Sequence, residues 1–395
     1  MKLNDLVQKL AAFEPGGFPV VSLYLDASGN ENGCDGYNTW LKAEIDELME
    51  SYDEDSAEAE SLKADIEKIQ QFLETEVVES ANGIAVFACG AADGFFETAQ
   101  LDEAFPNNRI FAFERPHIFP LVRIIEQNPR YAVLWSDTNK ADIYVFGGEN
   151  TLNVETETQA KIEEIENVVT QGTKVGGWSQ ARYQRHIANF HLQHAKETVE
   201  ELERLLQQAK IEYLVLCGDE RTIMPILRPQ LSKPVEESVV ETLNMSQYAS
   251  EYEIREKTRE VMSEQNIIKD QERAQRMYDA AKSAAGLGAM GVEETLAALS
   301  NGQVEELIIS SSFDAIKYSP KKVKKVLKAY APGDDNSTGD DLPDAKQSRQ
   351  IGDELIIRAL NSAAKITFIE DETLLKEANG VGAVLRYNIN ATANG

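Results

Sequence analysis

The stretch GVEETLAALSNGQVEELIISSS, from Gly291 to Ser312, changes its apolar pattern in the middle. GVEETLAALSNG has the spacing of a short helix that ends at an Asn-Gly turn. EELIISS, which follows at once, is a compact apolar run of the length of a buried strand. A helix followed directly by a strand is typical of α/β folds, so this stretch predicts an α/β protein.

The same alternation extends over the whole chain and predicts three domains. A chain of 395 residues exceeds what one hydrophobic core usually organises. Residues 1–128 combine helical patterns with the strand-like runs FPVVSLYLDAS, GIAVFAC and NRIFAFE. Residues 129–265 begin with the paired strands YAVLWSD and DIYVFGG and continue through a long helix to the strand YLVLCGD. Residues 266–395 contain the quoted stretch and the strands KITFIE and GAVLRY, with an acidic, turn-rich insert near 331–348 that we expect to be flexible.

The charge is strongly negative overall but unevenly distributed. A formal net charge of -28 argues against a nucleic-acid partner if it is averaged over the surface. However, residues 167–196 and 315–333 contain no Asp or Glu, and we call them the first and second basic segments. The first holds Lys174, Arg182, Arg185, His186, His191, His194 and Lys196, and the second holds Lys317, Lys321, Lys322, Lys324, Lys325 and Lys328. A lysine run is often only a solvated helix face, so for the second segment that reading and a contact with RNA or a partner both stay open.

The first basic segment contains KVGGWSQARYQRH, from Lys174 to His186, which predicts a glycine loop followed by a basic helix. Ser179 is the expected N-cap, and the helix is expected to run to about Lys210. At 100° per residue its apolar face includes His194, which we expect to be packed and hydrogen-bonded rather than a metal ligand. The opposite face carries Arg182, Arg185, His186, Asn189 and Gln193. Together with the helix dipole, these side chains favour phosphate.

Several other functions are disfavoured by the sequence. The cysteines Cys34, Cys89 and Cys217 lack the spacing of a zinc site or a disulfide framework and are expected to be buried thiols. GLGAMG, from Gly286 to Gly291, matches a dinucleotide motif, but a helical pattern precedes it where a strand is required, so it is expected to be a helix end, a turn and a new helix. We therefore expect no metal and no cofactor. Without a signal peptide or an apolar run of roughly 20 residues, the expected location is the cytoplasm, without contact with a membrane.

Three motifs resemble one protein family in the same order and spacing. GGWSQARYQRH is similar to the GGQSxxRFxR signature of the archaeal and eukaryotic class I release factors. GVEETLAALSNGQVEELIISSS resembles the start of their third domain, and GVGAVLRY resembles the GIGGILRY that closes it. On this resemblance, which covers roughly residues 130–390, the chain is identified as a bacterial member of the release factor and Pelota superfamily. Among its branches, it looks closest to the Balon-type ribosome hibernation factors.

The resemblance implies release-factor-like middle and C-terminal domains and a protein that binds the ribosomal A site, without a DNA partner. The loop Gly176, Gly177, Trp178, Ser179 and Gln180 would enter the peptidyl-transferase centre, and Lys174, Arg182, Arg185 and His186 would contact rRNA. The C-terminal domain would bind a translational GTPase, for which elongation factor Tu is the bacterial candidate. By analogy, the N-terminal domain would face the small subunit, although it has no recognisable stop-codon motif.

One departure from the family motif divides the functional predictions. Trp178 stands where the family has the glutamine that positions the hydrolytic water, and an indole has one N–H donor and no acceptor. This replacement favours a non-catalytic factor that occupies the A site of idle ribosomes, inhibits translation and protects the ribosome during stress, that is, ribosome hibernation. The alternative is a peptidyl-tRNA hydrolase, or ribosome rescue or release factor, that uses Gln180 two residues further on.

Overall fold

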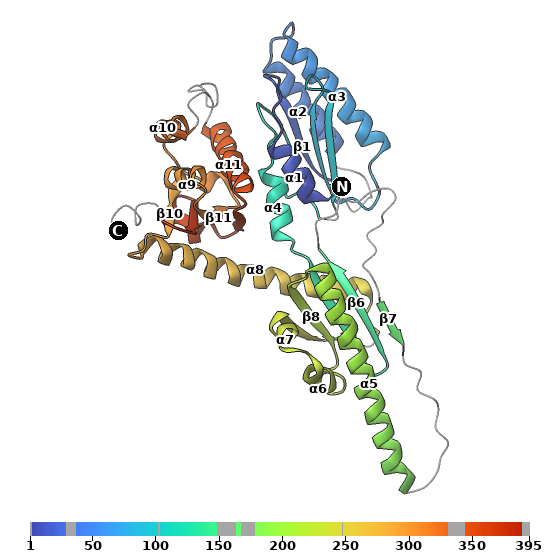
Figure 1. Cartoon of the computed structure of the whole chain (residues 1–395). Coiled ribbons are helices and arrows are strands. Elements are labelled where there is room, and N and C mark those ends of the chain that lie inside the picture. Colours follow the sequence, from blue (N-terminus) through green and yellow to red (C-terminus); the bar gives the residue numbers. More distant parts are fainter. Residues whose placement is uncertain are drawn as a thin grey trace. The chain divides into compact units, whose positions relative to one another are not determined.

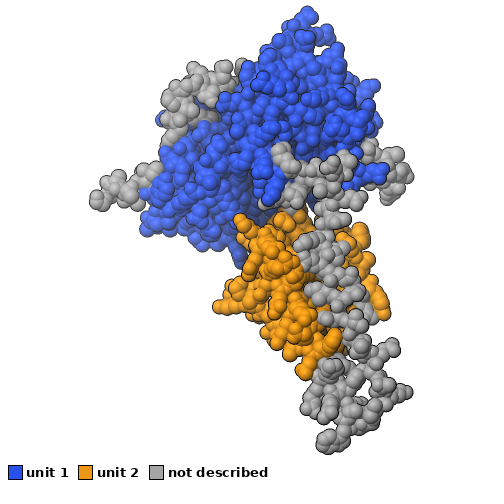
Figure 2. Space-filling model, turned by 45° about the vertical axis from the view of Figure 1, so that its right-hand side comes forward, with its two compact units in different colours: residues 1–127, 149–157, 267–395 blue, residues 128–148, 158–266 orange. Residues whose placement is uncertain are grey.

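The structure is a computed structural model that describes residues 2–28, 37–101, 103–147, 163–166, 178–246, 248–330 and 344–388. Within these ranges, only the backbone is described for residues 163–166, 178–187, 327–330 and 344–349. The chain forms two compact units, which are coloured separately in Figure 2. Unit 1 comprises residues 1–127, 149–157 and 267–395, and unit 2 comprises residues 128–148 and 158–266. The division into three domains stays a prediction.

The N-terminal part of unit 1 is an antiparallel sheet with the strand order β3-β2-β1-β4. Strand β1 is buried on both faces, because its side chains alternate between two cores. Leu23 and Leu25 belong to the core formed with α2 and α3, and Tyr24 belongs to the core that includes α1 and α4. The elements are α1 (Leu3–Ala11), β1 (Val20–Asp26), α2 (Tyr37–Glu50), α3 (Ala57–Thr75), β2 (Gly83–Cys89), β3 (Phe95–Leu101), β4 (Arg109–Phe113) and α4 (Phe119–Gln127).

The C-terminal part of unit 1 is built on a second sheet, with the order β10-β13-β11-β12, in which β11 and β12 are parallel. The quoted stretch forms helix α9 and strand β11, as predicted. Ile309 faces the core shared with α9 and α11, while Ile308 faces the core that contains Met277 of α8. The elements are α8 (Glu251–Lys282), β10 (Gly288–Met290), α9 (Gly291–Ser300), β11 (Val304–Ser310), η2 (Phe313–Ala315), α10 (Pro320–Tyr330), α11 (Asp344–Asn361), β12 (Lys365–Ile369), η3 (Glu372–Ala378) and β13 (Val381–Leu385).

The two parts of unit 1 share one hydrophobic core and a buried polar contact. His117 Nδ1 lies 2.6 Å from Asp353 Oδ2, and Asp353 Oδ1 accepts a hydrogen bond of 3.0 Å from the Phe119 N–H. The Phe119 ring lies 4.2 Å from that of Phe313, centroid to centroid. Since removal of one partner of a buried pair is strongly destabilising, this contact ties α4 to α11.

Unit 2 contains a five-stranded sheet with the order β7-β6-β5-β8-β9, in which β5, β8 and β9 are parallel (Figure 1). One face forms a core with α5, α6 and α7, and the other packs against the first part of α8. The predicted α/β class is therefore confirmed, and no described helix is long and apolar enough to cross a membrane. The elements before α8 are β5 (Tyr131–Ser136), β6 (Lys140–Phe146), β7 (Glu163–Glu166), α5 (Trp178–Ala209), β8 (Tyr213–Gly218), α6 (Met224–Leu227), η1 (Arg228–Gln230), α7 (Lys233–Ser238) and β9 (Val239–Asn244).

The glycine motif GLGAMG is not a simple turn, because its middle forms strand β10, which pairs with β13. A Cβ built on Gly288 would lie 2.4 Å from the main-chain nitrogen of Ala281, so the glycine lets the strand pack directly against the end of α8. The expected helix end and helix start flank this strand at Lys282 and Gly291. The expectation of a plain turn was therefore wrong for residues 288–290.

The cysteines that the structure describes, Cys89 and Cys217, are free and buried, as predicted. Burial raises the pKa of the Cys217 thiol to about 12 and also raises that of Cys89. Both thiols therefore stay protonated and behave as small apolar side chains. Cys34 lies outside the described residues.

Glu126 at the end of α4 is a half-buried carboxylate whose ionisation opposes folding. Burial raises its pKa from 4.5 to about 7, although the Phe368 N–H (3.1 Å) and Arg273 (3.5 Å) favour the charged form. Between pH 4.5 and about 7, Glu126 is mostly protonated in the folded protein but mostly ionised in the unfolded chain. The contribution of Glu126 to stability is therefore complete below pH 4.5 and is lost as the pH rises through about 7.

Replacement of Glu126 by glutamine should remove the loss of stability at high pH, because the amide imitates the neutral carboxyl group. At pH 8 we expect the free energy of unfolding of unit 1 to rise by on the order of 2–3 kcal/mol relative to the wild type, with a smaller difference at pH 5. Calorimetric unfolding at both pH values measures it, with the exposed Glu67→Gln as the control. Equal pH profiles for wild type and Glu126→Gln would contradict the assignment.

Candidate functional site

Helix α5 spans Trp178–Ala209, and its second half is anchored in the core of unit 2. Ala195, Val199 and Leu202 are buried against the sheet of unit 2 together with Leu205 and Leu206. None of the described side chains before His194, in residues 188–193, is buried. Figure 1 shows the N-terminal half of α5 running beyond the strands of unit 2. At 1.5 Å per residue, Trp178 lies about 24 Å along the axis from His194.

The structure describes only some of the predicted loop residues. Trp178, Ser179 and Gln180 form the first turn of α5, so the helix begins one residue before Ser179, the predicted N-cap. That prediction is corrected, since Ser179 lies within the helix. Arg182, Arg185 and His186 lie in the following two turns, where the structure describes the backbone. Lys174, Gly176 and Gly177 lie outside the described residues.

The predicted phase of α5 is confirmed where its side chains are described. Asn189 and Gln193, on the predicted polar face, are exposed, whereas His194, Thr198 and Leu202, on the predicted apolar face, are buried. The side-chain amide of Gln193 donates to Glu197 one turn later, over 2.9 Å. The polar face of the described part of α5 is therefore a solvated surface.

His194 is a packed, hydrogen-bonded histidine, as predicted. It is fully buried and hydrogen-bonds to the main chain of Lys140 on strand β6. Burial lowers the pKa of His194 below its ordinary value of 6.5, although the bond to Lys140 opposes this shift. In the part of the chain that the structure describes, no group of three His, Cys, Asp or Glu side chains is placed to hold a metal ion. His194 therefore fixes α5 on its sheet.

The second basic segment forms an amphipathic helix in unit 1. Val323 of α10 is buried in the core, while Lys321, Lys322 and Lys325 are exposed and Lys324 is half-buried. The side chain of Lys328 lies outside the described residues. The two predicted cationic sites belong to different units.

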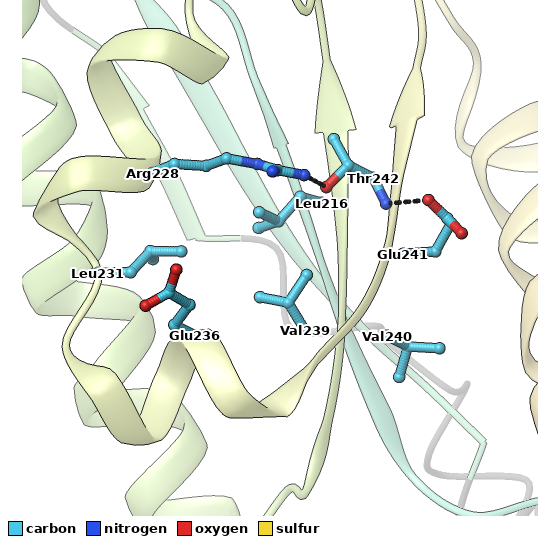
Figure 3. Close-up of a pocket in the computed structure, with 8 residues that line it drawn as sticks. All are labelled: Leu216, Arg228, Leu231, Glu236, Val239, Val240, Glu241 and Thr242. Carbon is cyan, nitrogen blue, oxygen red and sulfur yellow. Dashed lines mark hydrogen bonds between the residues drawn. The ribbon is translucent and has the colours of Figure 1, made fainter.

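A shallow pocket in unit 2, which the sequence did not predict, contains no residue of either predicted site (Figure 3). It has a volume of about 270 Å³. Arg228 donates a hydrogen bond to the Thr242 hydroxyl, and the Thr242 N–H donates to Glu241, so these polar groups are engaged with one another. The pocket is lined by Leu216, Arg228, Leu231, Glu236, Val239, Val240, Glu241 and Thr242. We assign it no catalytic role, since the Thr242 hydroxyl is hydrogen-bonded to Arg228 rather than to a base.

Two segments of the chain match known protein families. Residues 116–263, which include the glycine loop and α5, match the family described as "Bacterial archaeo-eukaryotic release factor family 10". Residues 267–389 match "eRF1 domain 3". The chain is therefore similar, over these two segments, to a bacterial release factor family and to the third domain of eRF1, which supports a place in the eRF1/Pelota superfamily. The expected superfamily and the release-factor-like C-terminal domain are confirmed.

Individual relatives are distant but extend over nearly the whole chain. Peptide chain release factor subunit 1 of Thermococcus kodakarensis is 22% identical over 428 residues, which cover 98% of each chain. The same subunit of Methanocaldococcus jannaschii is 23% identical, covering 98% of this chain and 97% of the relative. Among solved structures, Pelota of Archaeoglobus fulgidus is 16% identical, with coverage of 80% and 82% and a TM-score of 0.33.

The environment of His194 predicts a pH dependence for unit 2. Because its pKa is lowered in the folded state, the unfolded chain takes up a proton first as the pH falls below 6.5. The stability that the neutral ring contributes is therefore complete above pH 6.5 and is lost as the pH falls toward the lowered value. His194→Asn, which keeps a donor and cannot become charged, should reduce this acid destabilisation.

Calorimetric unfolding of unit 2 between pH 7.5 and 5 measures the effect, with the half-buried His191→Asn as the control. A His194→Asn profile that falls as steeply as that of the wild type would contradict the proposed neutral, buried state.

Proposed function

We propose that this protein is a ribosome-binding factor that occupies the A site of idle ribosomes and protects them, as the Balon-type hibernation factors do. The observation that carries the proposal is the geometry of α5, which is anchored from His194 onward and extends the glycine-loop end about 24 Å beyond that point. A site enclosed within a domain does not require such an extension, whereas insertion into a deep RNA cavity does. The relatives named as peptide chain release factors support the ribosome as the partner.

The proposed contacts follow from the chemistry of the residues near the start of α5. Gly176 and Gly177 permit a close approach of the backbone to RNA, and Trp178 offers a face for stacking on an exposed base. Arg182 and Arg185 would pair with rRNA phosphates, with Lys174 and His186 adding positive charge. Such a loop occupies the peptidyl-transferase centre without a group that positions water, because an indole N–H only donates.

The proposal gives the other parts of the chain supporting roles. The N-terminal part of unit 1 would face the small subunit. The part that matches eRF1 domain 3, residues 267–389, would bind the translational GTPase, which we propose to be elongation factor Tu. Co-elution of the two purified proteins in the presence of GTP tests this partner, and separate elution would exclude a stable complex off the ribosome.

The arginines of the first basic segment should dominate the salt dependence of ribosome binding. Arg182→Ala together with Arg185→Ala should weaken binding and make the slope of log affinity against log salt concentration shallower by about 2, one unit for each lost phosphate contact. Ribosome co-sedimentation at several salt concentrations measures both quantities. The matched control is Arg204→Ala with Arg221→Ala, since Arg204 lies on the anchored half of α5 and pairs with Glu201. If both double variants behave alike, the assigned role of the first segment is wrong.

Release of labelled peptide from peptidyl-tRNA held in the ribosome separates this proposal from a hydrolase. We expect the wild type to bind without releasing peptide. Gln180→Ala should behave like the wild type, because in this proposal Gln180 does not position a hydrolytic water. Gln193→Ala, an exposed position of the same helix, is the control. Release that disappears in Gln180→Ala and persists in Gln193→Ala would instead make the protein a rescue factor that uses Gln180.

A further inference from the structure

Helix α10 presents a lysine face whose opposite side is fixed in the core of unit 1. Val323 is 1% exposed, and Val326 packs partly buried against the same core. At 100° per residue, the lysines occupy the other side of the helix. We call Lys321, Lys322 and Lys325, which are exposed, the α10 lysine face. Because the core fixes the rotation of the helix, the lysine face is a preformed surface rather than a mobile run of charge.

The acidic side chains that the structure describes on the helix packed against α10 accept main-chain hydrogen bonds. Helix α10 contains no acidic residue and packs chiefly on α9. Glu293 accepts the Ser319 N–H over 3.2 Å, directly before the start of α10, and Glu294 accepts the Met290 N–H over 3.1 Å. Within the described part of the chain, Lys321, Lys322 and Lys325 form no ion pair. Other lysines do, as in Lys257 with Glu253 at 2.9 Å.

The arrangement is unfavourable for the helix itself. Lys321 and Lys325 lie one turn apart, and like charges at this spacing destabilise a helix by about 0.2–0.5 kcal/mol per pair. Lys321 and Lys322 also lie in the first turn, where the helix dipole favours acidic residues. Since these charges do not stabilise the fold, the lysine face is better explained by an anionic ligand.

We propose that the α10 lysine face binds the phosphate backbone of RNA. Lysine is a compact point charge suited to phosphate, and a row of lysines one turn apart matches a polyanion rather than a single carboxylate. Protein interfaces are instead centred on aromatic residues and arginine and are poor in lysine. No aromatic or arginine side chain lies among the described exposed residues of α10. The choice of RNA rests on the proposed ribosomal function, and the contact would be independent of base sequence.

The test uses the full chain with Lys321, Lys322 and Lys325 changed together to glutamine, which retains the helix propensity. The control variant changes three exposed lysines elsewhere, Lys42, Lys63 and Lys376, to glutamine and thus has the same net charge. Salt-dependent affinity is measured for two probes, purified ribosomes and a fluorescent RNA hairpin. On both, the α10 variant should show a slope of log affinity against log salt shallower by about 2–3 than the wild type, and the control should not.

Each outcome decides between the two proposals. An unchanged slope on ribosomes that the wild type binds would overturn the lysine face and leave the proposed function standing. A lysine-dependent slope on the hairpin without ribosome binding would support the face and contradict the function. If neither probe binds the wild type, both proposals fail. If the variant loses binding to elongation factor Tu while both RNA slopes stay unchanged, the face binds protein and the RNA proposal is wrong.

Discussion

The candidate site depends on the burial of one side of α5 against the sheet of unit 2. Five apolar side chains between Ala195 and Leu206 are buried there, and each large one contributes roughly 1.5–3 kcal/mol. His194 adds a hydrogen bond to the neighbouring strand at the point where the anchored part begins. In residues 188–193, just before His194, none of the described side chains is buried. The continuous helix connects the anchored part to Trp178.

The negative charge of the protein constrains where it can meet RNA. At physiological salt, exposed charges more than about 8 Å apart are largely screened, so a local surface matters more than the net value of -28. Neither of the two basic segments contains an Asp or Glu in its sequence. The two segments lie in different units. Binding through both would use few phosphates at each place and would require the two places to fit the same RNA surface. If both proposed contacts form, an acidic protein of this kind would gain selectivity, since RNA that fits only one of the two segments would be held weakly.

The sequence predicts strands well where they are buried on both faces. GIAVFAC and YLVLCG are compact apolar runs, and both form strands, β2 and β8, as expected. Several edge strands were missed, among them β3 and β9, because FFETAQL and VVETLN mix polar and apolar residues without a clear period. The three-residue strand β10 is set by its pairing with β13, about ninety residues later, and no local pattern indicates it.

The candidate site rests on residues that are close together in the sequence, whereas much of the fold depends on distant contacts. The glycines, Trp178 and the arginines lie within a dozen residues, and helical phase alone separates the exposed Gln193 from the buried His194. The contact between His117 and Asp353 joins residues 236 positions apart and has no local signal. Lys321 and Val323 lie on opposite faces of α10, as their spacing predicts. The core against which Val323 packs could not be predicted from that spacing. The sequence of a charged run therefore does not show whether it is a binding surface or a solvated face. That depends on the core contacts that fix the helix and on whether neighbouring carboxylates pair with its lysines.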